Sequence, residues 1–254
     1  MKKNKAKREI QKHYDLFWEG SFNALSFNMN FEDSLTYLKL ENKIASVSYS
    51  LDLELSETDD DEGKSYFKRQ IEKIDKYPEI ITPMVLVYLT SVFEIYIKGV
   101  IKVLLKFNPS PLDSSEKKVP LQTILSCTSL DHLLDVILND VTHELGYNSI
   151  SDQIEYLNKK INLNLSFKRL TGLVANRRFI NLSEIQEIFL IRNLILHNGG
   201  VVNKQYLSLT NKCGFKEGNK IEMTKEDIDN YFWILSNGAS AISRQSNLYI
   251  KNYR

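Results

Sequence analysis

The chain has 254 residues, of which 43% are hydrophobic and 26% charged, with only 10 glycines and 5 prolines. This length is enough for one large or two small packed cores, and the composition favours a helix-rich fold. A net charge of +1 excludes a global attraction to nucleic acid, so any RNA binding must depend on a local basic patch. The chain has two cysteines, no signal-peptide pattern and no uninterrupted apolar run long enough to cross a bilayer. These features predict a cytoplasmic protein without disulfides or a membrane segment.

Residues 1–77 are expected to form an N-terminal helical extension. Near its start, four apolar residues fall at helical spacing: Ile10, Tyr14, Phe17 and Trp18. Residues 31–55 fit either a helix or an alternating strand, and we assign a helix. The acidic run at residues 57–64 predicts an exposed loop, and it lacks the ligand spacing of a calcium loop.

Residues 78–254 are expected to form a second unit, a helical bundle. Thr82 and Pro83 are the residue types of an N-cap and a first helical position, so they predict a helix start. The following run is apolar nearly all round as far as the breaker at residues 108–111, which predicts a central core helix. Glu94 is the exception in this run, because a buried carboxylate needs a cationic partner. The nearest attractive partner for Glu94 would be Arg192 or another basic residue of the helix at residues 181–203. The alternative is that Glu94 is an ordinary surface glutamate.

Ser129, Ser151 and Thr224 are predicted to start three further helices, and residues 201–221 to form a short hairpin or loop. Residues 167–179 form a basic stretch with interleaved apolar residues. It indicates either a groove for an RNA backbone or an ordinary solvated face. Its four cations are Lys168, Arg169, Arg177 and Arg178.

Residues 181–203, NLSEIQEIFLIRNLILHNGGVVN, contain polar groups that a packed helix does not require. Ser183 and Gln186 predict a capping box at the start, and the two glycines at 199–200 predict the end. Four apolar residues share one face at helical spacing and are expected to face the core: Ile185, Ile188, Phe189 and Leu196. Arg192 falls on that same face, so packing alone does not explain it. Asn193 and His197 are four residues apart and lie one above the other on the neighbouring flank, His197 in the last turn.

A fixed cation, an amide and an imidazole on one rigid strip are suited to acid–base chemistry on a phosphodiester. The imidazole titrates near neutral pH, and the planar guanidinium grips phosphate oxygens. The alternative is a purely structural helix of the core, in which the arginine and the histidine only pair with or cap neighbouring groups.

The run from Arg192 to Asn203 resembles the R-x4–6-H signature of the HEPN superfamily, in its RN-x3-HN-x-G-x-V-N variant. The resemblance implies an all-α, HEPN-like helical bundle with a metal-independent endoribonuclease site completed across a homodimer through the 183–197 helix. It covers a small part of the chain, although the apolar helix upstream fits the family's layout and often carries an acidic residue at the place of Glu94.

This resemblance implies roles for the strip. His197 is expected to act as general acid or base, Arg192 to stabilise the charge on the phosphorane, and Asn193 to orient one of them, with Glu94 as a helper. Asn198 and the four cations are expected to contact RNA, and no cofactor or metal is expected. A toxin or antiviral-defence effector fits this chemistry, with an antitoxin or defence protein as a possible partner. The alternative is a non-catalytic subunit of such a system, in which the strip serves dimerisation or binds a nucleotide.

Overall fold

The structure is a computed structural model that describes residues 1–56, 61–113, 119–165, 181–210 and 215–253. Across these ranges the chain is helical and forms no β-strand, apart from a single antiparallel bridge between Val201 and Lys220. The all-α prediction is therefore confirmed. Residues 31–55, where a strand was the alternative, lie in a helix that runs without interruption from the N-terminal region.

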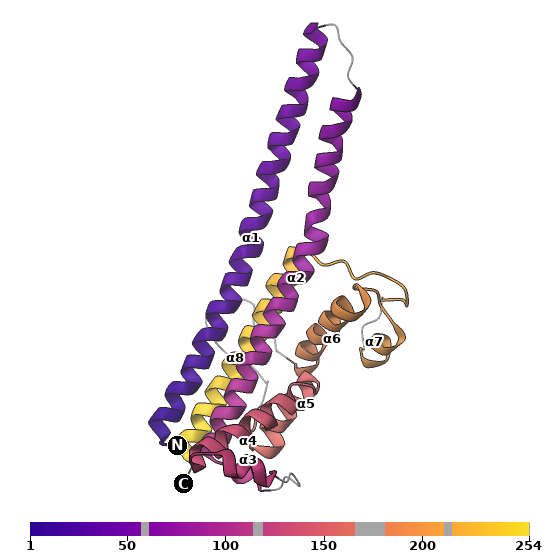
Figure 1. Cartoon of the computed structure of the whole chain (residues 1–254). Helices are drawn as coiled ribbons and strands as arrows, with labels where there is room; N and C mark the ends of the chain where they lie inside the picture. The colour runs from indigo at the N-terminus through magenta and orange to yellow at the C-terminus, as the bar shows by residue number, and fades with distance from the viewer. Residues whose placement is uncertain (57–60, 114–118, 166–180, 211–214, 254) are drawn as a thin grey trace.

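Two long helices and the C-terminal helix form the body of the protein (Figure 1). Helix α1 (Lys3–Ser56) and helix α2 (Asp61–Phe107) are antiparallel, and α8 (Lys225–Asn252) packs along the lower half of both. The core between them is aromatic: Phe17 of α1 lies 5.8 Å, centroid to centroid, from Phe93 of α2. Tyr96 of α2 is buried and donates a 2.9 Å hydrogen bond to the carbonyl of Ala239 in α8. The apolar stripe predicted near the N-terminus thus faces this core, because Ile10 and Phe17 are fully buried.

The distal parts of α1 and α2 continue beyond the other helices as a two-helix arm (Figure 1). The described contacts between its two helices are both polar and aromatic. Lys39 of α1 pairs with Asp75 of α2 at 2.5 Å, and the Tyr49 ring lies 5.7 Å from that of Phe67.

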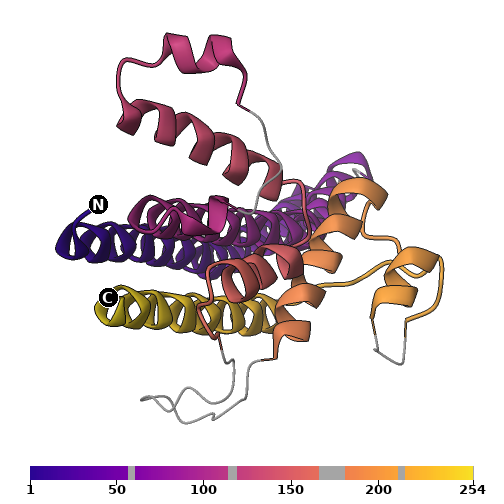
Figure 2. The same ribbon diagram turned by 90° about the horizontal axis from the view of Figure 1, so that it is seen from below.

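The remaining helices are short and surround α2. Helices α3 (Leu121–Ser126) and α4 (Leu130–Leu145) lie on one side, and α5 (Ile150–Glu155) and α6 (Leu182–Asn198) on another (Figure 2). A five-residue π-helical segment, Tyr156–Lys160, continues α5, and α7 (Lys204–Leu209) follows α6. Helix α6 packs against α2, α5 and α8, so the residues of the sequence motif lie on a helix that the core holds in place.

The predicted helix start at Thr82 is wrong, because α2 begins at Asp61 and passes through both Pro78 and Pro83. Each proline removes one backbone hydrogen bond, which usually costs about 3 kcal/mol inside a helix. Burial of Val85 and Leu86, which follow Pro83, offsets part of that cost, whereas Pro78 lies among exposed residues. The expected domain boundary at residue 77 consequently lies within a continuous helix, and separate folding of the two parts stays a prediction.

Two further local predictions need correction. Ser149, not Ser151, caps α5, in a reciprocal capping box with Asp152. Residues 201–221 were expected to form a short hairpin or loop; their described part contains the helix α7, a single bridge between Val201 and Lys220 and otherwise irregular chain. The starts predicted at Ser129 and Thr224 are confirmed, each with the side-chain oxygen accepting a backbone N–H.

Contrary to expectation, residues Ser65–Phe107 of α2 contain a window long and apolar enough to cross a membrane by length and composition. Because 44% of that window is buried inside the protein, a core helix accounts for the same composition.

Candidate functional site

Helix α6 carries the motif residues, and its ends are fixed by local sequence. The N-cap is Asn181 rather than Ser183: its side chain accepts from the Ser183 N–H, and the Glu184 carboxylate accepts from the Asn181 N–H at 3.0 Å. At the other end Gly199 and Gly200 have φ values of 59° and 79°, which glycine adopts without a Cβ penalty. The Gly200 N–H then donates to the Leu194 carbonyl at 2.9 Å, as in a Schellman-type end. The strip between these caps is therefore rigid.

Arg192 is held by two side chains from different helices. One terminal nitrogen donates to Glu94 Oε2 of α2 at 3.0 Å, and the other donates to Asn193 Oδ1 at 3.0 Å. The Arg192 and Glu94 side chains are 20% and 17% exposed, so the ion pair lies at the edge of the core with one side open to solvent. The partner that the sequence predicted for Glu94 is the one it has.

The open side of α6 presents Asn193, Leu196 and His197. Asn193 and His197 are exposed, and His197 is in the last turn of α6. Among the described residues, none hydrogen-bonds the His197 ring. Leu196 was expected to face the core, but it is 50% exposed and lies on the arc of the helix between Arg192 and His197.

Within one chain, Arg192 and His197 do not point the same way. Five residues advance a helix by about 500°, which leaves the two side chains roughly 140° apart around the axis. Arg192 reaches back to α2 while His197 projects into solvent at the helix end. Bringing both onto one phosphate therefore requires either a ligand that wraps the end of α6 or a second copy of it.

The rest of the motif builds the turn after α6. The Asn198 amide donates to the Val201 carbonyl at 2.5 Å, and the Asn203 side chain caps α7 by accepting from the Tyr206 N–H at 2.8 Å. The Val202 N–H donates to the Asn219 carbonyl at 2.8 Å. Asn198 thus has a structural partner, and its predicted contact with RNA stays a prediction. The other four residues predicted to bind RNA, Lys168, Arg169, Arg177 and Arg178, lie outside the described residues.

A cluster of ionisable side chains that was not predicted from the sequence lies where α6, α7 and α8 meet. Burial raises the pKa of Tyr206, and the nearby Glu187 carboxylate raises it further. Burial likewise raises the pKa of Tyr231, with Asp227 and Glu187 adding to the effect. No spacing rule could have found this cluster, because each helix contributes one or two of its members.

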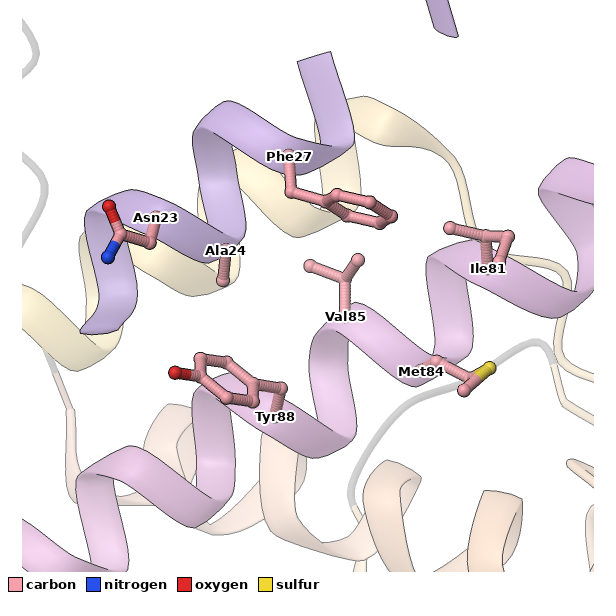
Figure 3. A pocket seen from close by; sticks show the side chains of 7 residues that line it. All are labelled: Asn23, Ala24, Phe27, Ile81, Met84, Val85 and Tyr88. Carbon is pink, nitrogen blue, oxygen red and sulfur yellow. The ribbon is translucent and has the colours of Figure 1, made fainter. Parts of the chain in front are cut away.

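No group of three or more possible metal-ligating side chains gathers anywhere in the described part of the chain. An apolar groove of about 320 Å³ opens between α1 and α2 near the base of the arm (Figure 3). Phe27, Val85 and Tyr88 line it, and none of the motif residues does. Its lining carries no charged group, so it lacks the chemistry expected of a phosphate site.

Comparisons with known proteins give no family to which the chain can be assigned. No protein-family model, no curated protein and no solved structure matches it. The case for a function therefore rests on the residues of this chain.

Proposed function

We propose that this protein is a metal-independent endoribonuclease of the HEPN type that acts in the cytoplasm as a toxin or antiviral-defence effector. The observation that carries the proposal is the arrangement on α6: a guanidinium fixed by Glu94 and Asn193 at 3.0 Å each, and an exposed imidazole one turn further along the same rigid helix. A packed helix needs neither group at its open edge.

In the proposed reaction, the ribose 2′-oxygen attacks the adjacent phosphorus while a general base takes the 2′-hydroxyl proton. The bond from phosphorus to the 5′-oxygen breaks, and that oxygen takes up a proton. The products are a 2′,3′-cyclic phosphate and a 5′-hydroxyl end. His197 performs one of the two proton transfers, and Arg192 stabilises the negative charge that builds up on the phosphorane oxygens.

Arg192 keeps donors for this task. A guanidinium has five N–H groups, and the two contacts with Glu94 and Asn193 use one from each terminal nitrogen. The Arg192 Nε has no acceptor among the described residues although it is buried. In this proposal Glu94 and Asn193 are positioning residues that hold the guanidinium, and its two remaining terminal N–H groups contact the phosphate.

A homodimer through residues 183–197 would complete the site. Two-fold pairing brings the same patch of each chain together, so one α6 can supply the arginine and the other the imidazole to a shared cleft. The half-exposed Leu196, between Arg192 and His197 on the open arc, gives such a contact an apolar centre.

The test is cleavage of total cellular RNA by the purified protein in EDTA, followed by analysis of the RNA ends. We expect wild type to produce cyclic phosphate ends and His197→Ala to lose this activity. Replacement of His143, an exposed histidine on α4 outside the strip, by alanine is the matched control and should leave cleavage unchanged. Absence of cleavage by wild type, or equal cleavage by His197→Ala, contradicts the ribonuclease proposal.

The second candidate is a non-catalytic subunit of a defence or toxin–antitoxin system, and one observation favours it. The ion pair with Glu94 satisfies the charge of Arg192 without any ligand, as expected of a purely structural arginine. In that case Arg192→Lys should lower stability, RNA should remain intact, and a nucleotide or partner protein should bind at α6.

A further inference from the structure

The arm carries an apolar face that nothing in the described chain covers. Five residues of α1 form what we call the outer stripe, and each is between 53% and 71% exposed. Its members are Tyr37, Leu40, Ile44, Val47 and Leu51. Exposed apolar residues are common singly, but a continuous row of five on one helix is characteristic of a contact surface.

The outer stripe lies on the side of α1 that faces away from α2. With 3.6 residues per turn, its members cluster within about 80° around the helix. The residues that α1 turns toward α2 lie roughly 160° away and are mixed in character: Leu35 is buried and Tyr49 half-buried, alongside the polar Lys39, Asn42 and Ser46. Helix α1 therefore carries a second, continuous apolar row on its outer side, in addition to the mixed side that packs on α2.

The spacing of the outer stripe specifies a helical occupant. Its residues alternate at intervals of three and four, the a and d pattern by which helices pack knobs into holes. The stripe spans 14 residues, about 21 Å, which is the length of two heptads, or about four helical turns, on a partner helix.

We propose that the outer stripe pairs antiparallel with the outer stripe of a second copy of this chain. In that register Ile44 lies opposite the partner's Val47, and Leu40 opposite the partner's Leu51, so the central layers each join two apolar side chains of similar size. Tyr37 at one end faces the partner's Glu54, where its hydroxyl can donate to the carboxylate.

The charged residues beside the outer stripe and the surface area of the stripe are both compatible with self-pairing. In this register Glu41 is beside the partner's Ser48, and Lys43 beside the partner's Ser50, so no like charges face each other. The five side chains offer roughly 500 Å² per copy, and two copies together bury on the order of 1,000 Å², the threshold for a specific interface. The pairing does not depend on the proposed ribonuclease activity.

The test measures self-association of the full chain by analytical ultracentrifugation. All proteins carry Leu196→Glu, so that a dimer through α6 does not mask the arm contact. We expect this background protein to dimerise, and Ile44→Glu with Val47→Glu to raise the dimer dissociation constant at least about tenfold with unchanged helical content. Ser34→Glu with Ala45→Glu adds the same charge on exposed α1 positions roughly 100° from the stripe, and should leave the constant unchanged.

A second measurement does not depend on how well the charged variants fold. A nitroxide on Ser34→Cys, in a chain with Cys127→Ser and Cys213→Ser, should lie about 35 Å from its copy along the antiparallel pair. A monomeric background protein at tens of micromolar, an unaffected Ile44→Glu/Val47→Glu variant, or a label distance near 15 Å would each overturn the pairing. None of these outcomes bears on RNA cleavage by His197.

Discussion

Removing the carboxylate of Glu94 is the sharpest test of how α6 is held on α2. Loss of one partner from a fully buried ion pair costs about 3–5 kcal/mol, whereas an exposed pair is worth about 0–1 kcal/mol. The two side chains are 17% and 20% exposed and 3.0 Å apart, so Glu94→Ala should fall between these limits, at about 2 kcal/mol. For a chain of this length that corresponds to a fall in Tm of about 4–8 °C.

The assay is urea unfolding followed by circular dichroism, with Glu79→Ala as the control, because Glu79 is an exposed glutamate on the same helix. The control should change the free energy of unfolding by less than about 0.5 kcal/mol. A double-mutant cycle with Arg192→Ala should give a coupling of about 1–2 kcal/mol between the two residues. If Glu94→Ala is as stable as Glu79→Ala, or if the coupling is absent, the ion pair does not hold α6 and Arg192 is not positioned in the way argued above.

Three further predictions concern activity, pH and packing. Arg192→Lys should lose most of the cleavage rate with the fold intact, since lysine lacks the planar fork of the guanidinium. His197→Ala should lower the rate about 10²–10⁴-fold and remove any inflection of the rate near neutral pH. Single-turnover kinetics on RNA measures both effects, and a chelator should leave the cleavage rates unchanged. Burial lowers the pKa of His13 below its ordinary 6.5, so the unfolded state binds more protons in acid: the stability linked to His13 is present above pH 6.5 and is lost as the pH falls, and His13→Gln should flatten the pH dependence of Tm in this window. Asn28 is 1% exposed and neither polar atom of its amide has a partner among the described residues, so Asn28→Leu should stabilise by about 1–2 kcal/mol in calorimetry, and a lower Tm would mean that the amide is satisfied or the leucine overpacks.

The all-α fold could be predicted because its signals are local. The spacing of Ile10 and Phe17 and the caps at Ser129 and Thr224 each specify one stretch of helix, and each has the predicted structure. The prediction failed at Thr82, where a sequence typical of a helix start lies in the middle of α2. Packing against α1 decided that conformation, and no local rule contains it.

In the candidate site, too, features set by local sequence could be predicted and features set by packing could not. Spacing placed Asn193 and His197 on one flank of α6, and the isolated charge of Glu94 indicated Arg192 as its partner across two helices. The exposure of Leu196 and the structural use of Asn198 in the turn could not be predicted, because both depend on where α6 ends against its neighbours. The outward face of the arm was equally hidden: Ile44, Val47 and Leu51 predicted a helix correctly, but their period does not say which side of it the rest of the chain covers.

The packing of α8 against α1 has a consequence for synthesis on the ribosome. Helix α8 begins more than 200 residues after the start of α1, yet it supplies Phe232 and its neighbours to the same core. At about 5–20 residues per second, the N-terminal half of α1 is exposed on the order of 10–40 s before that partner exists. Helix α2 is made early enough to pair with α1 during this interval, so a nascent chain passes through a two-helix hairpin with one side of its core bare. Only after α8 emerges can it pack against α6, so the candidate site on α6 reaches its final support when translation is nearly complete.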